Sequence, residues 1–210
     1  MSVTHQPSLV RTVAGTEVPL AGDWEVDPGH AEVAFVGRHF MMTKVRGRFT
    51  DVAGVVRIAD DPADSAVEVT IGMASVSSGS ADRDDHLRSP DFFDVDRHPT
   101  ATFRSTRVAW AGTRATVDGG LTIVGVTRPV VLEVEYLGAV GDPWGGRRAV
   151  FSAWTEVNRE DWGLTWNMAL EAGGVMVSKK IRIEIEVETV LAADGGTPVP
   201  EAEAPDGAGA

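Results

Sequence analysis

The sequence predicts an all-β protein with antiparallel strands, and two observations carry that prediction. Apolar and polar residues alternate strictly in several segments, as they do in a strand with one buried and one solvated face. Turn residues separate these segments, and 43% of the 210 residues are hydrophobic while only 24% are charged, which is enough apolar material for a packed core. Long strands with one apolar face must pair into a sandwich or close into a barrel.

The clearest strand lies near the C-terminus, in "VSKKIRIEIEVETV". Its branched apolar residues, from Val177 through Ile181, Ile183 and Ile185 to Val187, alternate with lysine, arginine and glutamate. The same alternation occupies 67–73, 117–123 and 130–136. Less regular apolar segments at 24–35, 44–58, 100–110 and 149–157 bring the expected total to about eight strands.

Two segments interrupt the alternating pattern. "GRHFMMTKVRG", residues 37–47, is compatible with one helical turn. "SADRDDHLRSP", residues 80–90, predicts a short helix with Ser80 as N-cap and Pro90 just beyond its end. We expect both segments to lie at an end of the barrel or sandwich.

The chain is predicted to hold one folded domain over residues 21–192. Residues 1–20 are expected to form a flexible N-terminal segment. Apart from Thr197, residues 193–210 consist of Pro, Gly, Ala and acids with Val199 as the one large apolar residue, so we expect a disordered acidic tail.

Charge and composition exclude several classes of function. The net charge is −12, and the last twenty residues hold four acids with no Lys or Arg, which leaves about −8 for the rest. Nucleic acid is therefore an unfavourable partner, because phosphate binding needs a positive field. The absence of cysteine removes disulfides and thiolate sites. Neither a signal peptide nor a run of ~18 apolar residues is visible, so the sequence predicts a soluble, cytoplasmic protein without a membrane span.

The sequence predicts no catalytic residue, no metal and no cofactor. Neither a G-x-S-x-G elbow nor a glycine-rich phosphate loop occurs, and the histidines lack metal-ligand spacing. A metal site from His86, Asp84 and Asp91 remains the weaker alternative. The acids of 84–96 are interleaved with arginines, so ion pairs and helix-end charges explain them better than an acid/base pair.

Aromatic and methionine side chains are the best candidates for a function. Phe40, Met41 and Met42 fall in one interrupting segment, and Phe92 and Phe93 follow the other. Such positions usually carry Asn, Ser or Gly, so something apolar must lie beneath these side chains. They either plug the core or line an apolar cavity, where methionine would adapt to a ligand.

Five stretches of this chain resemble the YceI-like family of lipid-binding proteins. They are "WEVDPGHAEVAFVGRHFMMTKVRGRF", "DRDDHLRSPDFFDVDRHPTATFRS", "GGLTIVGVTRPVVLEV", "VNREDWGL" and "SKKIRIEIEVE", in the family's order and at its spacings. Ala31, Trp162 and the acidic tail depart from the family's pattern. The resemblance implies an antiparallel eight-stranded lipocalin-like barrel with one or two short helical inserts, and a homodimer.

The resemblance also implies that the barrel binds, sequesters or transports an amphiphile with a long isoprenoid or fatty chain. Isoprenoid quinones, polyprenyl compounds and fatty-chain lipids are the expected partners. "HLRSPDFFDV" resembles a lid that turns Leu87, Phe92 and Phe93 inward and its acids toward water. The predicted ligand-binding residues are Phe35, His39, Phe40, Met41, Met42, Phe49, Met73, Leu87, Phe92, Phe93, Phe103, Trp154 and Trp162. The alternatives are a barrel enzyme, an isomerase or hydrolase with a hydrophobic substrate, and a ligand-free, stress-related interaction protein.

Overall fold

The computed structural model describes residues 9–40, 42–168 and 176–192. Its described residues form eleven strands, one α-helix and three short 3-10 helices. In chain order these are β1 Val10–Val13, β2 Thr16–Pro19, β3 Gly22–His39, β4 Thr43–Phe49, β5 Val52–Ile58, η1 Pro62–Asp64, β6 Ala66–Gly72, η2 Met73–Ser75, α1 Ala81–Arg88, β7 Thr100–Ala111, β8 Arg114–Ile123, β9 Val126–Gly141, β10 Arg147–Asn158, η3 Arg159–Trp162 and β11 Lys180–Leu191.

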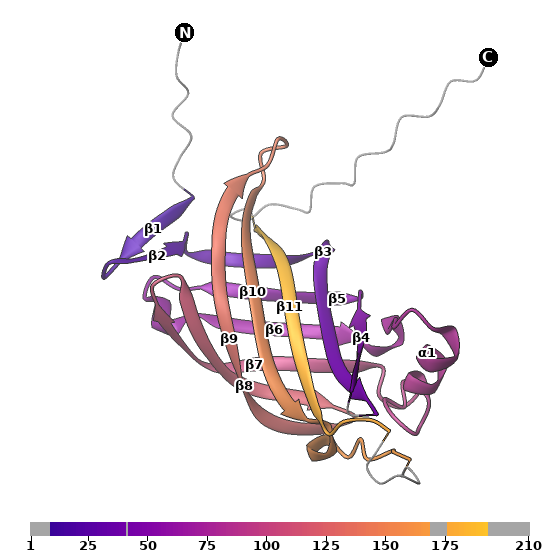
Figure 1. Cartoon of the computed structure of the whole chain (residues 1–210). Helices are drawn as coiled ribbons and strands as arrows, with labels where there is room; N and C mark the ends of the chain where they lie inside the picture. The colour runs from indigo at the N-terminus through magenta and orange to yellow at the C-terminus, as the bar shows by residue number, and fades with distance from the viewer. Residues whose placement is uncertain (1–8, 41, 169–175, 193–210) are drawn as a thin grey trace, which may run out of the picture.

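Eight antiparallel strands close into a barrel, which confirms the predicted fold class (Figure 1). Strands β5 to β11 pair in sequence order, and β11 returns to pair with β3. The long β3 pairs with β5 through Gly22–Glu25 and with β4 through Val33–His39, so β4 and β5 together act as one neighbour of β3. Closing the barrel gives β3 and β11 a partner on both sides, whereas β4 stands at the end of the strand order and pairs with β3.

The predicted alternation of β11 is confirmed by the direction of its side chains. Ile183, Ile185 and Val187 face the barrel interior. Arg182 and Glu184 face outward, where the Arg182 Nε donates to Glu184 at 3.0 Å. A barrel strand of this kind requires an apolar face toward the interior and a polar face toward the solvent.

The segment 37–47 forms a strand, a turn and a strand, so the expectation of a helical turn there is wrong. β3 continues to His39, and the Met42 N–H donates back to the His39 carbonyl at 3.1 Å. Phe40 sits in the turn with φ of 51°. The short helix is present as α1, with Ser80 at the N-cap position but without a side-chain cap bond.

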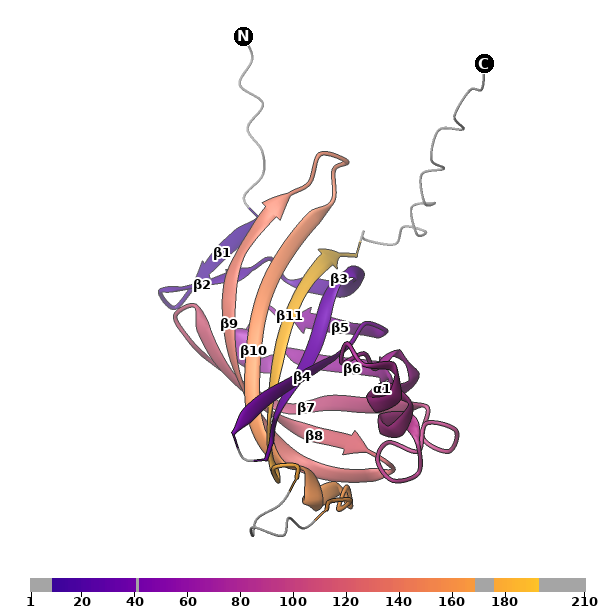
Figure 2. The ribbon, with the colours of Figure 1, turned by 45° about the vertical axis from the view of Figure 1, so that its right-hand side comes forward.

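The two ends of the barrel are covered differently (Figures 1 and 2). We call the end that carries α1 the lid end. The other end lies beneath the β1–β2 hairpin, and we call it the plugged end. Its core contains Trp24, Ile58, Tyr136, Ala149 and Phe151, all buried.

The β1–β2 hairpin departs from the prediction that residues 1–20 are flexible. Val18 is fully buried, and the Arg11 Nη1 donates to the Asp60 carbonyl at 2.7 Å, which ties the hairpin to the end of β5. Residues 1–8 and the predicted tail, 193–210, lie outside the described residues. None of the helices in the described parts of the chain is long and apolar enough to cross a membrane.

Candidate functional site

A cavity of about 420 Å³ occupies the barrel interior. All eight barrel strands contribute apolar side chains to its wall, among them Val33, Val56, Val69, Phe103, Leu121, Leu132, Phe151 and Ile185. The volume lies within the range of roughly 300–1,000 Å³ typical of small-molecule sites. The cavity is therefore large enough and apolar enough to hold part of a hydrocarbon chain.

The segment of α1 and the turn after it, residues 81–99, covers the lid end. Leu87, Phe92 and Phe93 line the cavity, in the direction expected from the sequence. The Phe93 ring lies 5.6 Å from the Phe49 ring and 6.4 Å from the Phe35 ring, between centroids. These distances are typical of favourable tilted or edge-on aromatic pairs.

Hydrogen bonds fix the covering segment to the barrel. The Arg88 guanidinium donates to the carbonyls of Ala74 at 3.0 Å and Val76 at 2.8 Å, which joins the last turn of α1 to η2. Asp84 is buried and accepts from the Ser78 N–H at 2.7 Å. Asp84 precedes the ten residues whose acids are expected to face water, and its buried carboxylate organises the loop before the helix.

His86, a residue of the weaker metal alternative and not of the predicted ligand-binding set, lines the cavity. Its Nε2 lies 2.9 Å from an Asp91 carboxylate oxygen. Its ring meets the rings of Phe92 and Trp166 edge-on at 5.0 Å and 4.6 Å, and all three residues line the cavity. Because Trp166 follows η3, this aromatic group joins the lid to a segment far along the chain.

The side chains of His86, Asp84 and Asp91, the weaker metal alternative, do not come together as a ligand set in the described part of the chain. Asp84 does not join the pair of His86 and Asp91 as a potential ligand set. The carboxylates and imidazole that do come together are those of Asp27, His30 and Glu188.

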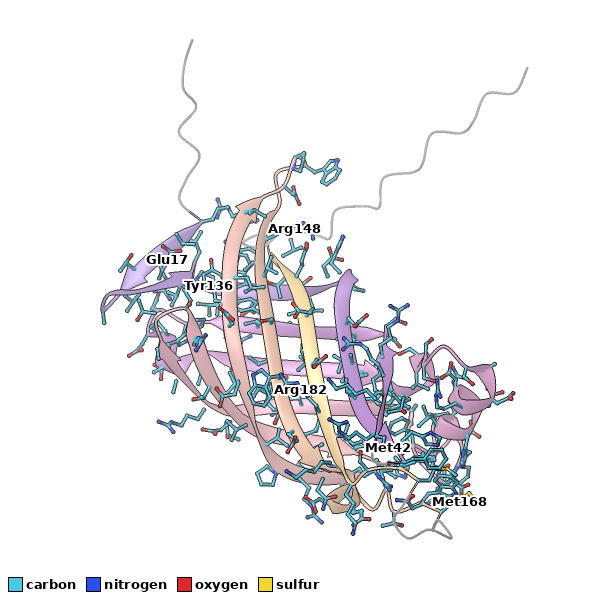
Figure 3. The ribbon with its side chains drawn as sticks, viewed as in Figure 1. Glu17, Met42, Tyr136, Arg148, Met168 and Arg182 are labelled. Carbon is cyan, nitrogen blue, oxygen red and sulfur yellow. The ribbon has the colours of Figure 1, made fainter. Side chains whose placement is uncertain are left out.

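The Arg148 guanidinium lies among these acids near the upper end of β10 (Figure 3). It contacts Asp27, Asp142 and Glu188. Its hydrogen bond to Asp27 holds the pKa of that carboxyl below its usual value. Because an arginine already neutralises these acids, the group is best explained as an ion-pair network.

Nine of the thirteen predicted ligand-binding residues line the cavity. They are Phe35, His39, Phe49, Met73, Leu87, Phe92, Phe93, Phe103 and Trp162.

The other four predicted residues do not line the cavity in the described structure. Phe40 and Met42 lie on the exposed turn between β3 and β4, with Met42 75% exposed. Trp154 points outward between the inward residues Ala153 and Thr155, with the Arg182 guanidinium 4.2 Å above its ring. The prediction that Phe40, Met42 and Trp154 line the cavity is wrong. Trp154 points outward because side chains alternate along a strand, and its neighbours Ala153 and Thr155 take the inward positions. Met41 lies outside the described residues.

Arg159 is the buried charged group of the cavity wall, and the sequence reasoning missed it. It opens η3, where the Asn158 side chain accepts from the Glu160 N–H at 3.2 Å and Gly163 closes the turn with φ of 79°. The side chain is 5% exposed. Its Nε donates to the Ser178 carbonyl at 3.1 Å and its Nη1 to the Leu164 carbonyl. Burial lowers the pKa of this guanidinium.

Three buried polar atoms have no hydrogen-bond partner among the described residues. They are the Arg159 Nη2, the Trp110 Nε1 and the Tyr136 hydroxyl. Arg159 and Trp110 line the cavity, Arg159 near the lid end and Trp110 near the plugged end. Tyr136 lies in the core beneath the hairpin, close to Glu17 (Figure 3). Burial, with a contribution from the Glu17 charge, raises the pKa of Tyr136 to about 12.

The sequence is similar to that of many bacterial proteins. It is 36% identical over 174 residues to a UPF0312 protein of Pseudomonas paraeruginosa, covering 81% of this chain and 88% of the relative. It is 40% identical over 170 residues to a UPF0312 protein of Photorhabdus laumondii, covering 80% and 86%. Protein YceI of Salmonella newport is 36% identical over 186 residues, covering 87% and 94%.

Solved structures share the fold. The Campylobacter jejuni YceI protein matches with a TM-score of 0.64 and 28% identity, covering 74% of this chain and 90% of that one. BcnA of Burkholderia cenocepacia matches with a TM-score of 0.68 and 23% identity, covering 78% and 98%. A polyisoprenoid binding domain from Saccharophagus degradans matches with a TM-score of 0.56 and 15% identity, covering 80% and 98%. The family model of the YceI-like domain matches residues 24–189, and the chain belongs to the YceI-like family.

Proposed function

We propose that this protein binds a long-chain amphiphile inside the barrel and acts as a carrier or buffer for it. The observation that carries the proposal is the apolar cavity of about 420 Å³, closed at one end by core residues and covered at the other by the α1 segment. The polyisoprenoid binding domain of Saccharophagus degradans has the same fold, which supports an isoprenoid chain as one class of ligand. Isoprenoid quinones, polyprenyl compounds and fatty-chain lipids all meet the requirement for such a chain.

Burial of the chain supplies the affinity. Each buried CH₂ contributes about 0.8 kcal/mol, so one five-carbon isoprene unit contributes roughly 3–4 kcal/mol. A few units reach useful affinity after the cost of association is subtracted. Chain length and width should therefore decide which ligands bind most tightly.

The first experiment identifies the bound molecule. Protein purified under native conditions is denatured, extracted with organic solvent and analysed by mass spectrometry, and we expect one long-chain amphiphile per chain. Adding the same compound to stripped protein at a hundredfold excess over Kd should stabilise the fold by about 2.7 kcal/mol. For a chain of this size, that corresponds to a rise of about 5–10 °C in Tm. An empty extract together with an unchanged Tm for quinones, prenyl compounds and fatty acids would refute the proposal.

A pair of variants tests whether the cavity is the binding site. Phe93→Ala removes an aromatic ring from the cavity wall, so we expect less bound ligand and a changed preference for chain length. Trp154→Ala is the matched control, because it removes a larger ring from the outer face of the same barrel. Equal loss of ligand in both variants would place the binding site elsewhere.

We also propose binding without catalysis, supported by the apolar wall along most of the cavity. Among the described residues, the His86–Asp91 pair at the lid end is a candidate group for the enzyme alternative. A ligand incubated with the protein should be recovered chemically unchanged. Turnover that disappears in His86→Ala would establish the enzyme alternative instead.

A further inference from the structure

The titratable side chains of the cavity wall are arginines and histidines. Among the described residues that line it are three arginines and two histidines, and no aspartate or glutamate. This is unexpected in a chain with a net charge of −12. Arg38, His39, Arg83 and His86 belong to the β3–β4 turn region and the α1 segment at the lid end. A ligand that enters there meets these basic side chains, with the Asp91 carboxylate beside His86, and then an apolar wall.

Arg159 differs from the other two cavity arginines in two respects. It is buried, and one of its N–H groups has no hydrogen-bond partner among the described residues. Arg38 and Arg83 are exposed, whereas Arg159 is 5% exposed. Its partners are two neutral carbonyls, those of Ser178 and Leu164, and its Nη2 has no partner in the described part of the chain.

No carboxylate of the described residues forms an ion pair with Arg159, although the Glu160 charge partly offsets the effect of burial on the Arg159 pKa. The adjacent Glu160 is paired with the Lys179 ammonium at 2.8 Å, and Asn158 and Asp161 interact with one another. Arginine stays protonated even when burial lowers its pKa. A buried charge of this kind is costly unless an opposite charge with good hydrogen-bond geometry meets it.

We propose that Arg159 contacts the head group of the bound amphiphile, and that this head group is an anionic oxygen group, a carboxylate or a phosphate. The inference rests on the proposed function and gives the ligand a chemical class and an orientation. The head group lies against the Arg159 guanidinium near the lid end. The chain then runs along the apolar wall toward the plugged end, where Trp110 and Phe151 line the cavity.

Trp110 is the basis for the opposite orientation of the ligand, in which the head group lies toward the plugged end. Its Nε1 is also buried without a partner among the described residues, and it lies toward the opposite end of the cavity. An indole N–H is a neutral donor, so a neutral acceptor would satisfy it. A guanidinium gains more from an anion, because charge-assisted bonds are shorter and about twice as strong as neutral ones.

The test compares ligands that differ only in the head group, with full-length protein stripped of endogenous lipid. One pair is hexadecanoate and hexadecanol, and the other is farnesyl phosphate and farnesol. We expect the anion to bind about 10- to 100-fold more tightly than the alcohol in at least one pair. The pair with the larger ratio identifies the carboxylate or the phosphate as the natural head group.

Three variants assign the preference to a residue. Arg159→Gln should reduce the ratio of anion to alcohol affinity to about threefold or less, while the alcohols still bind. Arg107→Gln removes the same charge from the outer face, where Arg107 faces Asp118, and should keep the preference. Trp110→Phe should keep it as well. If Arg159→Gln does not fold, Arg159→Lys replaces it, and the smaller ammonium should lower the ratio without abolishing it.

Each outcome tests a different part of the proposal. Equal binding of acid and alcohol by the unmodified protein overturns the head-group assignment but leaves chain binding intact. A preference that survives in Arg159→Gln or Arg159→Lys at full strength overturns the role of Arg159, and one lost in Trp110→Phe reverses the orientation. If neither the anions nor the alcohols bind, the proposed function itself has failed.

Discussion

The two ends of the barrel use the same eight strands but differ in the charge of the buried polar groups that lack a partner among the described residues. At the plugged end, Trp24 is fully buried and its indole Nε1 donates to the Leu20 carbonyl at 3.0 Å, within the chain. At the lid end, Arg159 is almost as buried, yet its Nη2 lacks a partner in the described structure. The groups without a described partner at the plugged end, the Tyr136 hydroxyl and the Trp110 Nε1, are neutral, whereas the one at the lid end belongs to a charged guanidinium. The two ends therefore differ in the kind of ligand group that each could bind.

The largest expected effect is at the plugged end. Trp24→Ala removes a fully buried ring and should lower the free energy of unfolding by about 3–5 kcal/mol, measured by urea denaturation. Trp154→Ala, which truncates a 41% exposed ring, is the control and should cost about 1 kcal/mol or less. If the two variants lose the same stability, the plugged end is not a rigid part of the core.

High pH should weaken the plugged end through Tyr136. Its pKa is raised to about 12 by burial, against about 10 in the unfolded chain, so the unfolded state releases the phenolic proton first. Stability from this group is complete below pH 10 and is lost as pH rises toward 12, by about 2–3 kcal/mol. Tyr136 is the one tyrosine in the chain, so phenolate absorbance follows it directly.

The matched variant for this prediction is Tyr136→Phe. It removes a buried hydroxyl that has no partner among the described residues, so near pH 7 stability should be unchanged or slightly higher. Between pH 10 and pH 12 the variant should lose less stability than the parent. Phenolate that forms near pH 10 in the folded parent would contradict the burial of this hydroxyl.

At the lid end, a smaller loss is expected from Asp84→Ala. The substitution leaves the Ser78 N–H without its carboxylate acceptor, at a cost of about 1–3 kcal/mol. Because Asp84 orders the loop that leads into α1, ligand content should fall as well. Asp85→Ala is the control, since the exposed Asp85–Arg88 pair contributes about 1 kcal/mol or less. Equal effects of the two variants would mean that the buried carboxylate does not organise the lid.

The smallest effect is expected at Trp144, in the turn between β9 and β10. Its side chain is 87% exposed, so Trp144→Ser should change stability by no more than about 0.5 kcal/mol and leave ligand content unchanged. Size-exclusion chromatography of the variant and the parent checks the predicted homodimer at the same time. A dimer that dissociates in the variant would show that this turn mediates contact between two copies.

The barrel could be predicted from the sequence because its inner face follows a two-residue period. Ile183, Ile185 and Val187 obey that period, and so do Val67, Val69 and Ile71, all of which line the cavity. The β1–β2 hairpin was missed because its two-residue turn is Ala14–Gly15, with φ of 49° and 81°. Such turns usually contain Asn-Gly or Asp-Gly, and alanine rarely adopts a positive φ.

The candidate site was harder to predict than the fold. The aromatic residues of the cavity were found because large apolar side chains in an interrupting segment need a surface to cover, as with Phe92 and Phe93. Arg159 gives no such signal, since an arginine followed by two acids in "VNREDWGL" has the pattern of a solvated turn. Its burial depends on the tertiary packing that brings Leu164 and Ser178 against it.

The pairing of β11 with β3 also determines the order of events during folding. β3 and β11, the first and last strands of the barrel, can pair only after the whole barrel sequence is available. An ion pair across β3 joins Arg46 of β4 to Glu184 of β11, 138 residues apart in sequence. Contacts so distant in sequence slow folding, because loop-closure entropy must be overcome before they form. Until closure, the apolar inner faces of the strands stay exposed on the nascent chain. Charged side chains of β3, β4 and β11, such as Glu32, Arg46 and Glu184, would then discourage the open edges from pairing with other chains.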